Sequence, residues 1–262
     1  MQWIRSAISH SATHWGILLL FGVSSFFPFY FLQNPEELPF SFDVFVRISQ
    51  IMIVGISIPL WWGGYQLGGY SLIWRFAVLG VYSLGIEIFA IQTGWIYSDF
   101  EYGDIIGQTI AEVPWTVAFS WLPLFTFALG VVMYIKRWQY RIFWGTVILV
   151  WCDIVLDPAA TELGFWSWEI SEGFYNVPWH NFAGWIFSSA GAFGVWELLN
   201  PSWELSHNAG RKILMFSGLL SLSFWTIMNI WLGFWIPVLA GLLLMLMGYI
   251  AGYTSSVGIR TS

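Results

Sequence analysis

Long runs of apolar, uncharged residues constrain the fold of this chain more than any other feature. The hydrocarbon core of a bilayer is about 30 Å thick, and an α-helix needs roughly 20 apolar residues to cross it. Such runs fall near residues 14–33, 44–63, 71–94, 113–135, 140–156, 180–199, 212–229 and 233–253. With 58% hydrophobic and 9% charged residues, the chain lacks the charged surface of a soluble domain. We therefore predict an all-α polytopic membrane helical bundle with about eight transmembrane helices.

The separation of the last two runs rests on few residues. No charged residue lies between Lys212 and Arg260, and a tight hairpin is indicated there only by Asn229, Gly233 and Pro237. Seven spans are therefore the alternative to eight.

Because no linker and no convincing internal repeat is visible, residues 1–262 are predicted to form a single integral membrane domain.

The basic residues predict how the chain is oriented, because short cytoplasmic loops carry an excess of Lys and Arg. In an eight-span arrangement only Arg47 falls on the acidic side, and the other basic residues share the opposite side: Arg5, Arg75, Lys136, Arg137, Arg141, Arg211, Lys212 and Arg260. Both termini are thus predicted to be cytoplasmic in a prokaryotic cell membrane. The first run lacks a clear cleavage site, so we expect it to be a retained helix.

Several classes of site are excluded by the residues that are missing. Cys152 is the only cysteine, and no cluster of Cys and His has the spacing of a zinc or iron–sulfur site. Phosphate loops, dinucleotide fingerprints and basic nucleic-acid-binding faces are also absent. We predict no metal, no cofactor and no nucleic-acid partner.

Acidic residues and tryptophans gather in two loops, at 85–115 and 152–185. The eight-span arrangement places both loops at the same edge of the membrane. Three acids lie within or next to the adjoining spans: Glu87, Asp153 and Asp157. Ionisable groups inside membrane helices are costly and by default suggest a function. These loops are therefore where we expect chemistry.

A structural role is the alternative to a catalytic one for two of these acids, Glu87 and Asp157. Glu87 lies about two turns before the end of its span and could instead make a structural hydrogen bond to another helix. Asp153 and Asp157 are four residues apart, so a helix places them on one face. Two carboxylates at this spacing repel if both are ionised, so one is expected to keep its proton. The alternative for Asp157 is that it ends its helix directly before Pro158.

Polar and aromatic residues near these acids complete the candidate site. Asn181 can orient water or a carboxylate, since an amide both donates and accepts hydrogen bonds, whereas His180 is more often an ordinary interfacial anchor. Indole faces stabilise cations, and the acidic loops contain Trp95, Trp166, Trp168 and Trp185.

The two loops carry an ordered set of motifs. The first reads Glu87…Thr93-Gly94-Trp95…Tyr102-x-Asp104-x-x-Gly107…Val113-Pro114-Trp115…Trp121. The second reads Asp153…Leu156-Asp157-Pro158…Gly164-x-Trp166-x-Trp168…Gly173-x-Tyr175-x-Val177-Pro178…Asn181-Phe182-x-Gly184-Trp185. Over about 80–190 this pattern resembles the carotenoid biosynthesis hydratase family, which includes bisanhydrobacterioruberin hydratases and carotene 1′-hydratases.

The resemblance implies cofactor-independent addition of water to the terminal C1–C2 double bond of an acyclic carotenoid ψ-end. Protonation at C2 leaves a tertiary cation at C1, which water captures. Such a site needs an acid, an aromatic wall and a held water. We expect Asp153 to be the acid and Glu87 its partner, or the reverse, with Asp157 and Asn181 holding the water.

Substrate contacts are expected from Thr93, Trp95, Tyr97, Trp166, Trp168 and Trp185. The expected partners are the acyclic carotenoid, water and membrane lipids, with other enzymes of carotenoid synthesis as a further class. The substrate would enter sideways from the bilayer.

Other functions remain open at this level. A lycopene-type cyclase or isomerase would form the same cation but exclude water, and the acidic segment Pro35-Glu36-Glu37 occurs in some membrane lycopene cyclases. A solvated loop is the favoured explanation of that segment, because loops readily carry such residues. A non-catalytic carotenoid- or lipid-binding membrane protein and a small transporter are further alternatives, although matching broken helices typical of transporters are not evident.

Overall fold

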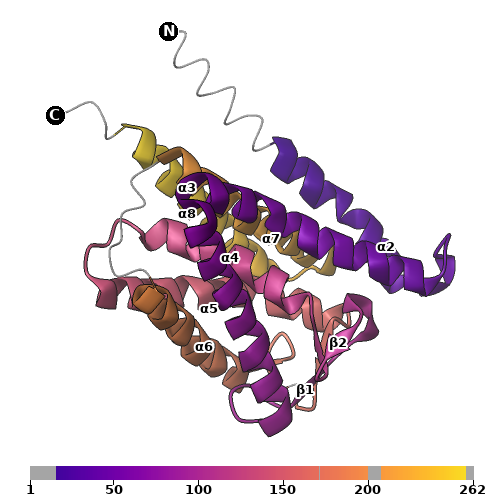
Figure 1. Ribbon diagram of the computed structural model, residues 1–262. Coiled ribbons are helices and arrows are strands. Elements are labelled where there is room, and N and C mark those ends of the chain that lie inside the picture. The colour runs from indigo at the N-terminus through magenta and orange to yellow at the C-terminus, as the bar shows by residue number, and fades with distance from the viewer. Residues whose placement is uncertain (1–15, 171, 200–207, 258–262) are drawn as a thin grey trace.

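A computed structural model describes residues 16–170, 172–199 and 208–257 as a bundle of membrane helices (Figure 1). The helical segment Gly16–Gln33, which includes α2 (Phe26–Gln33), is followed by α3 (Phe42–Thr93), α4 (Val117–Val132), α5 (Trp138–Glu162), α6 (Trp179–Leu199), α7 (Asn208–Leu232) and α8 (Trp235–Val257). Within the described residues, six helices are long and apolar enough to cross a bilayer, and α4 is a shorter apolar helix. The predicted all-α membrane bundle is confirmed.

Helix α3 contains two of the predicted apolar runs, joined at Gly69. The backbone of Gly69 has φ 57° and ψ −147°, a conformation that costs little only for glycine. Figure 1 shows the two arms, 42–68 and 70–93, running in different directions. Trp61 of the first arm meets Phe76 of the second edge to face, with ring centroids 6.2 Å apart. When α3 is counted as two arms, each predicted run lies largely in a helix.

Two predicted helix limits are wrong. The run 113–135 begins with a strand, and its helix starts only at Val117. Helix α5 continues past Pro158 to Glu162, so Asp157 does not end it. Proline removes one backbone donor, and membrane helices tolerate it where neighbouring helices satisfy the freed carbonyl. By contrast, the expected hairpin after α7 is present, with Gly233 at φ 76°.

The two acidic loops fold against each other at one end of the bundle. Strand β1 (Phe100–Tyr102) of the first loop pairs antiparallel with β4 (Trp166–Trp168) of the second. Each loop also contains a small hairpin: β2 (Thr109–Ile110) with β3 (Val113–Pro114), and β5 (Gly173–Phe174) with β6 (Val177–Pro178). The first acidic loop also contains a short 3₁₀ turn, η2 (Asp104–Ile106), and a second such turn, η1 (Pro35–Glu37), lies outside these loops, between α2 and α3. Pairing of β1 with β4 makes one structure of two loops.

The structure contains an internal repeat, which corrects the expectation that there is none. Each copy consists of a helix, a glycine in the left-handed conformation, a strand, a β-hairpin with a two-residue turn, and a second helix. The glycines are Gly94 and Gly164, at φ 63° and 73°. The hairpin turns have positive φ at both central residues, as type I′ turns require: Ala111 and Glu112 in one, Tyr175 and Asn176 in the other. Each hairpin ends in Val-Pro-Trp, at 113–115 and 177–179.

The two copies contact each other through equivalent residues. Phe100 pairs with Trp168 and Tyr102 with Trp166, so exchanging the two strands reproduces the same pairing. Trp121 and Trp185 each lie six residues beyond the tryptophan of Val-Pro-Trp, and their rings stack with centroids 6.5 Å apart. Reciprocal contacts of this kind indicate a local two-fold axis. The first helices of the two copies run in the same direction, and each carries an arginine near its start, Arg75 or Arg141. The axis therefore follows the direction of the helices.

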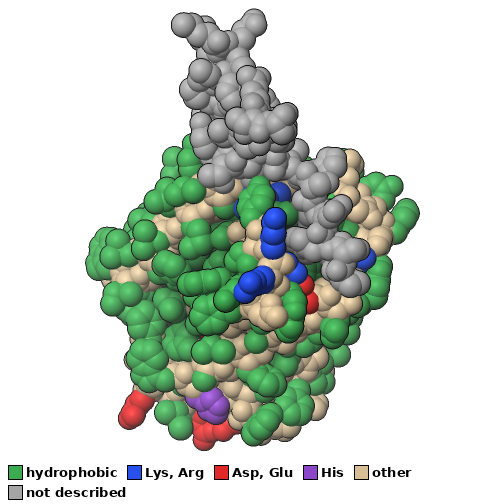
Figure 2. Space-filling view, turned by 90° about the vertical axis from the view of Figure 1, so that its left-hand side faces the viewer, with side chains coloured by type: hydrophobic (Ala, Val, Ile, Leu, Met, Phe, Trp, Pro, Cys, Tyr) green, Lys and Arg blue, Asp and Glu red, His purple; other side chains and the backbone are tan. Residues whose placement is uncertain are grey.

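Charged side chains are separated toward the two ends of the molecule. On the face drawn in Figure 2, Lys and Arg gather toward one end, most Asp and Glu lie at the other, and hydrophobic side chains cover the area between. This separation is typical of a protein whose apolar waist lies in a bilayer. Arg5 and Arg260, which support the predicted cytoplasmic position of the termini, lie outside the described residues.

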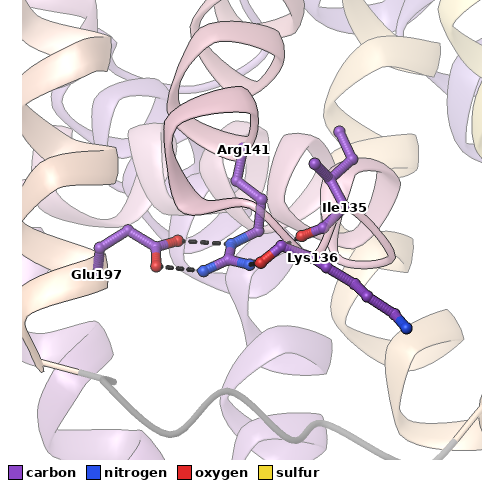
Figure 3. A network of polar contacts seen from close by, with 4 residues as sticks. All are labelled: Ile135, Lys136, Arg141 and Glu197. Atoms are coloured by element: carbon purple, nitrogen blue, oxygen red, sulfur yellow. Dashed lines mark hydrogen bonds and ion pairs between the residues drawn. The ribbon is translucent and has the colours of Figure 1, made fainter.

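At the basic end, Arg141 joins α5 to α6 (Figure 3). Its guanidinium forms a bidentate ion pair with Glu197, including a bond of 2.7 Å from Nε to Oε1. The same group donates to the carbonyl oxygens of Ile135 and Lys136, at 2.8 and 3.1 Å. Arg141 therefore satisfies backbone acceptors between α4 and α5 while it anchors the end of α6.

Candidate active site

A small cavity lies at the acidic end of the bundle, on the interface between the two repeats. It encloses about 50 Å³. Since one buried water needs roughly 10–15 Å³, the cavity has room for a few waters but not for a carotenoid end group. Its walls are Glu87, Tyr97, Phe100, Tyr102, Asp157, Trp166, Trp168, Asn181 and Trp185.

One side of the cavity is formed by a cluster of two acids and an amide. Asn181, in the first turn of α6, donates from Nδ2 to Asp153 Oδ2 at 3.1 Å and also to Asp157 Oδ2. The two carboxyl groups of α5 lie within hydrogen-bonding reach of each other. Two carboxyls share a hydrogen bond only if one carries a proton. All three residues are buried, and Asp153 lies behind the other two and does not line the cavity.

Glu87, on the second arm of α3, also lines the cavity. It is buried, with 8% of its surface exposed, and Tyr102 of β1 donates a hydrogen bond of 3.2 Å to its Oε2. Glu87 is close enough to Asp157 for the two charges to interact. The cavity therefore has a carboxyl group from each repeat on its wall.

Aromatic rings from the paired strands close the cavity toward the loops. Phe100 packs on Trp168 with centroids 5.1 Å apart, and Tyr102 meets Trp166 edge to face at 6.0 Å. The Trp168 indole is held by a 3.0 Å hydrogen bond to Thr161 Oγ1. These rings line the same small cavity as the carboxyls, and aromatic rings can stabilise a transient cation at such a place.

Tyr97 enters the cavity from the first loop and packs against α6. A side chain on Gly184 would collide with the Ile96 carbonyl and the Tyr97 ring, so glycine makes this approach possible. Burial, together with the nearby charge of Glu87, raises the pKa of the Tyr97 and Tyr102 hydroxyls well above the usual tyrosine value. Both phenols therefore remain hydrogen-bond donors at neutral pH.

Most of the predicted site residues are brought together. The cavity or the cluster behind it contains Glu87, Tyr97, Asp153, Asp157, Trp166, Trp168, Asn181 and Trp185. Two predicted substrate contacts lie elsewhere. Thr93 is exposed and donates to the Phe89 carbonyl at 2.6 Å, and Trp95 is 70% exposed.

Other residues singled out in the sequence lie away from the cavity. His180 is exposed and is not among the lining residues. Glu37 belongs to the exposed turn η1, where it accepts a hydrogen bond from Tyr30. Neither His180 nor Glu37 lines the cavity.

Phe100 and Tyr102 line the cavity without having been predicted as site residues. Both lie on one face of β1, because alternate residues of a strand point the same way. Their alternation with Glu101 was the available signal, but a three-residue strand is too short for it to be distinctive.

The carotenoid biosynthesis protein family matches residues 45–248, which include both repeats and the whole cavity. The chain belongs to this family. The match extends well beyond the stretch of about 80–190 that carried the resemblance in sequence, and it includes α7 and most of α8.

A relative with a named activity is also similar to part of the chain. A bisanhydrobacterioruberin hydratase of Haloarcula japonica is 35% identical over 118 residues. The similar stretch spans 43% of this chain and 40% of the relative, so less than half of each protein is compared. No solved structure matches the chain.

Proposed function

We propose that this protein is a carotenoid hydratase, which adds water to the terminal C1–C2 double bond of an acyclic carotenoid ψ-end without a cofactor. Membership of the carotenoid biosynthesis family and the similarity to a hydratase support this assignment. The observation that carries it is the cavity itself, where carboxyls of two helices and an amide meet an aromatic wall at the end of an apolar bundle.

The reaction uses these groups in two steps. A carboxylic acid donates its proton to C2, the π electrons form the new C–H bond, and a tertiary cation remains at C1. The oxygen of a held water then forms a bond to C1, and a carboxylate accepts the proton that this oxygen loses. The number of protons on the enzyme is restored, and the product is a tertiary alcohol. Aromatic faces next to C1 lower the energy of the cation.

The geometry favours Glu87 over Asp153 as the proton donor. A donor must come within hydrogen-bonding distance of the reacting carbon. Glu87 lines the cavity, whereas Asp153 lies behind Asp157 and Asn181. This is the reverse of the slight preference drawn from the sequence, in which Asp153 was the acid and Glu87 its partner.

The substrate is expected to enter from the surrounding lipid. An acyclic carotenoid dissolves in the hydrocarbon core, and the outer faces of the helices are apolar. Because the cavity holds only a few waters, the ψ-end must displace aromatic side chains as it enters. In the proposed setting the protein spans a prokaryotic cell membrane many times, with both termini cytoplasmic and the cavity at the opposite edge.

The test is to express the chain in a bacterial host that accumulates lycopene and to analyse the pigments by mass and retention time. A product heavier by one or two waters is expected, and Glu87→Gln should abolish it while the protein remains in the membrane. A cyclised product of unchanged mass would instead identify a cyclase. Unchanged lycopene, and unchanged longer acyclic carotenoids in the same assay, would contradict the proposed activity.

A further inference from the structure

Glu87 and Asp157 occupy equivalent positions in the two repeats. Each lies seven residues before the left-handed glycine of its copy, Gly94 or Gly164. Both carboxyls line the cavity, which lies on the interface between the copies. The local two-fold arrangement thus places one acid of each repeat on the cavity wall, on helices that enter from the same end of the bundle.

The surroundings of these two acids are not equivalent. The position that matches Asp153 in the first repeat is Ser83, whose hydroxyl bonds to the Gly80 carbonyl of its own helix at 2.9 Å. The position that matches Asn181 is Val117, which has no polar side chain. The cluster that surrounds Asp157 therefore has no counterpart around Glu87.

In the paired strands it is the first repeat that donates a hydrogen bond to its acid, and the second repeat that does not. Tyr102 and Trp168 are equivalent in the register of β1 and β4. Tyr102 donates to Glu87, whereas the Trp168 indole donates to Thr161 and not to Asp157. Glu87 thus accepts a hydrogen bond from the Tyr102 phenol, while Asp157 lies beside a second carboxyl and accepts a hydrogen bond from an amide.

From this asymmetry we infer that the two repeats divide the reaction: the first protonates the alkene through Glu87, and the second holds and deprotonates water through Asp157, Asn181 and Asp153. This inference rests on the proposed hydratase function. It assigns each carboxyl a separate step, although the two occupy equivalent positions in the fold.

Each cluster is suited to its step. After Glu87 gives its proton to C2, the Tyr102 hydroxyl stabilises the carboxylate that remains. On the other side, Asn181 uses Nδ2 to hold both aspartates, so its Oδ1 is left to accept a hydrogen bond from water. Asp157 accepts the second hydrogen of that water and takes the proton when the C1–O bond forms. Asp153 shares a hydrogen bond with Asp157 and acts as a positioning residue.

Separating the two steps requires an assay that detects protonation without hydration. If the cation forms but is not captured by water, it loses a proton from C2 or from a neighbouring carbon and returns to an alkene. In D₂O this path leaves deuterium in recovered or isomerised polyene. The experiment uses the purified full-length protein in lipid nanodiscs with lycopene as substrate, and reads both deuterium content and hydrated product.

The informative variants replace residues of the second repeat by their counterparts in the first. Asn181→Val and Asp153→Ser are expected to reduce hydrated product at least about tenfold, the order expected for loss of a charge-assisted hydrogen bond, while deuterium still enters the polyene. Glu87→Gln is expected to lose both deuterium and product. Gly194→Ala, at an open position on α6, serves as the control that retains wild-type behaviour.

Two outcomes overturn the inference. One is deuterium incorporation that persists in Glu87→Gln. The other is loss of deuterium together with product in both second-repeat variants, with each variant still showing a cooperative thermal unfolding transition. If wild-type protein forms no hydrated product from lycopene or longer acyclic carotenoids, the proposed function has failed instead, so the two failures are distinguishable.

Discussion

The Tyr102 hydroxyl reaches from the loop strand β1 to helix α3 and donates a 3.2 Å hydrogen bond to Glu87 Oε2. This bond links the acidic loop to a carboxyl inside the bundle. Because it favours the ionised form of Glu87, it should stabilise the state that follows proton transfer. It is therefore one of the contacts through which the loop can influence the chemistry.

Replacing Tyr102 by phenylalanine should slow hydration about 10- to 100-fold, because hydrogen bonds to charged groups contribute about 1.5–3 kcal/mol. Initial rates in nanodiscs, measured over a range of pH, would show the decrease and a change in the pH profile. Tyr70→Phe, at an exposed tyrosine, is the matched control. An unchanged rate and pH profile in Tyr102→Phe would show that this bond has no part in catalysis.

A side chain at Gly184 should remove activity by displacing Tyr97. The added Cβ would meet the Ile96 carbonyl and the Tyr97 ring, and backbone atoms cannot move aside cheaply. Gly184→Val is expected to lose most hydrated product, whereas Gly194→Val on the same helix faces open space and should retain it. Wild-type turnover by Gly184→Val would mean that the position of Tyr97 is not important.

Gly69→Ala should destabilise the protein by about 1–3 kcal/mol, the cost of holding a non-glycine residue in a rare backbone conformation. Among the residues that the structure describes, no atom lies within 4 Å of the added Cβ, so the cost is expected to come from the backbone. Gly55→Ala, which also faces open space but lies within the helical first arm of α3, should be neutral or stabilising. Thermal unfolding in detergent compares the two, and equal midpoints would contradict the role of Gly69 at the break.

Removing Arg141 should destabilise the basic end of the bundle. Arg141→Met leaves Glu197 and two carbonyl oxygens without their donor, and breaking a buried ion pair typically costs about 3–5 kcal/mol. Arg137→Met, at an exposed arginine, is the control. The expected result is a lower unfolding temperature for Arg141→Met only, with hydration retained at temperatures where the variant is folded, since the cavity is at the opposite end.

The buried tyrosines should make stability sensitive to alkaline pH. Burial raises the pKa of Tyr97 and Tyr102 in the folded protein, whereas an unfolded tyrosine titrates near pH 10. The contribution of these tyrosines to the free energy of unfolding is therefore complete below about pH 10. It is lost as the pH rises above that value, because the unfolded state then releases protons more readily. Unfolding midpoints measured across alkaline pH should fall less steeply in a Tyr97→Phe, Tyr102→Phe double variant. An equal slope would contradict this coupling.

Local patterns were enough to predict the membrane helices. A run of apolar residues identifies a span regardless of what lies beside it, because the surrounding lipid imposes the requirement. The run around Asp153 was predicted to be helical for this reason, and α5 includes it. The same reasoning placed Glu87, Asp157 and Asn181 at one edge of the membrane, where the structure brings their side chains to one cavity.

Contacts between distant segments were not predictable in the same way. The pairing of Glu101 with Ser167 joins residues 66 positions apart, and strands of three residues carry almost no periodic signal. The internal repeat was hidden for a related reason. Its copies share few residue identities beyond Val-Pro-Trp and the left-handed glycine, and both features become meaningful only when the turns around them are known.

Hydropathy and helix geometry act over a few adjacent residues, so they were enough to predict a membrane bundle with acids gathered at one edge. The equivalence of Glu87 and Asp157 in two repeats, and the place of Asp153 behind the cavity wall, became visible only in the folded protein. Tertiary structure also decided that Trp95 stays at the surface while Tyr97 enters the site. These outcomes depend on side-chain packing between helices and loops far apart in the chain, and hydropathy carries no information about which of two neighbouring aromatic residues finds space beside Gly184.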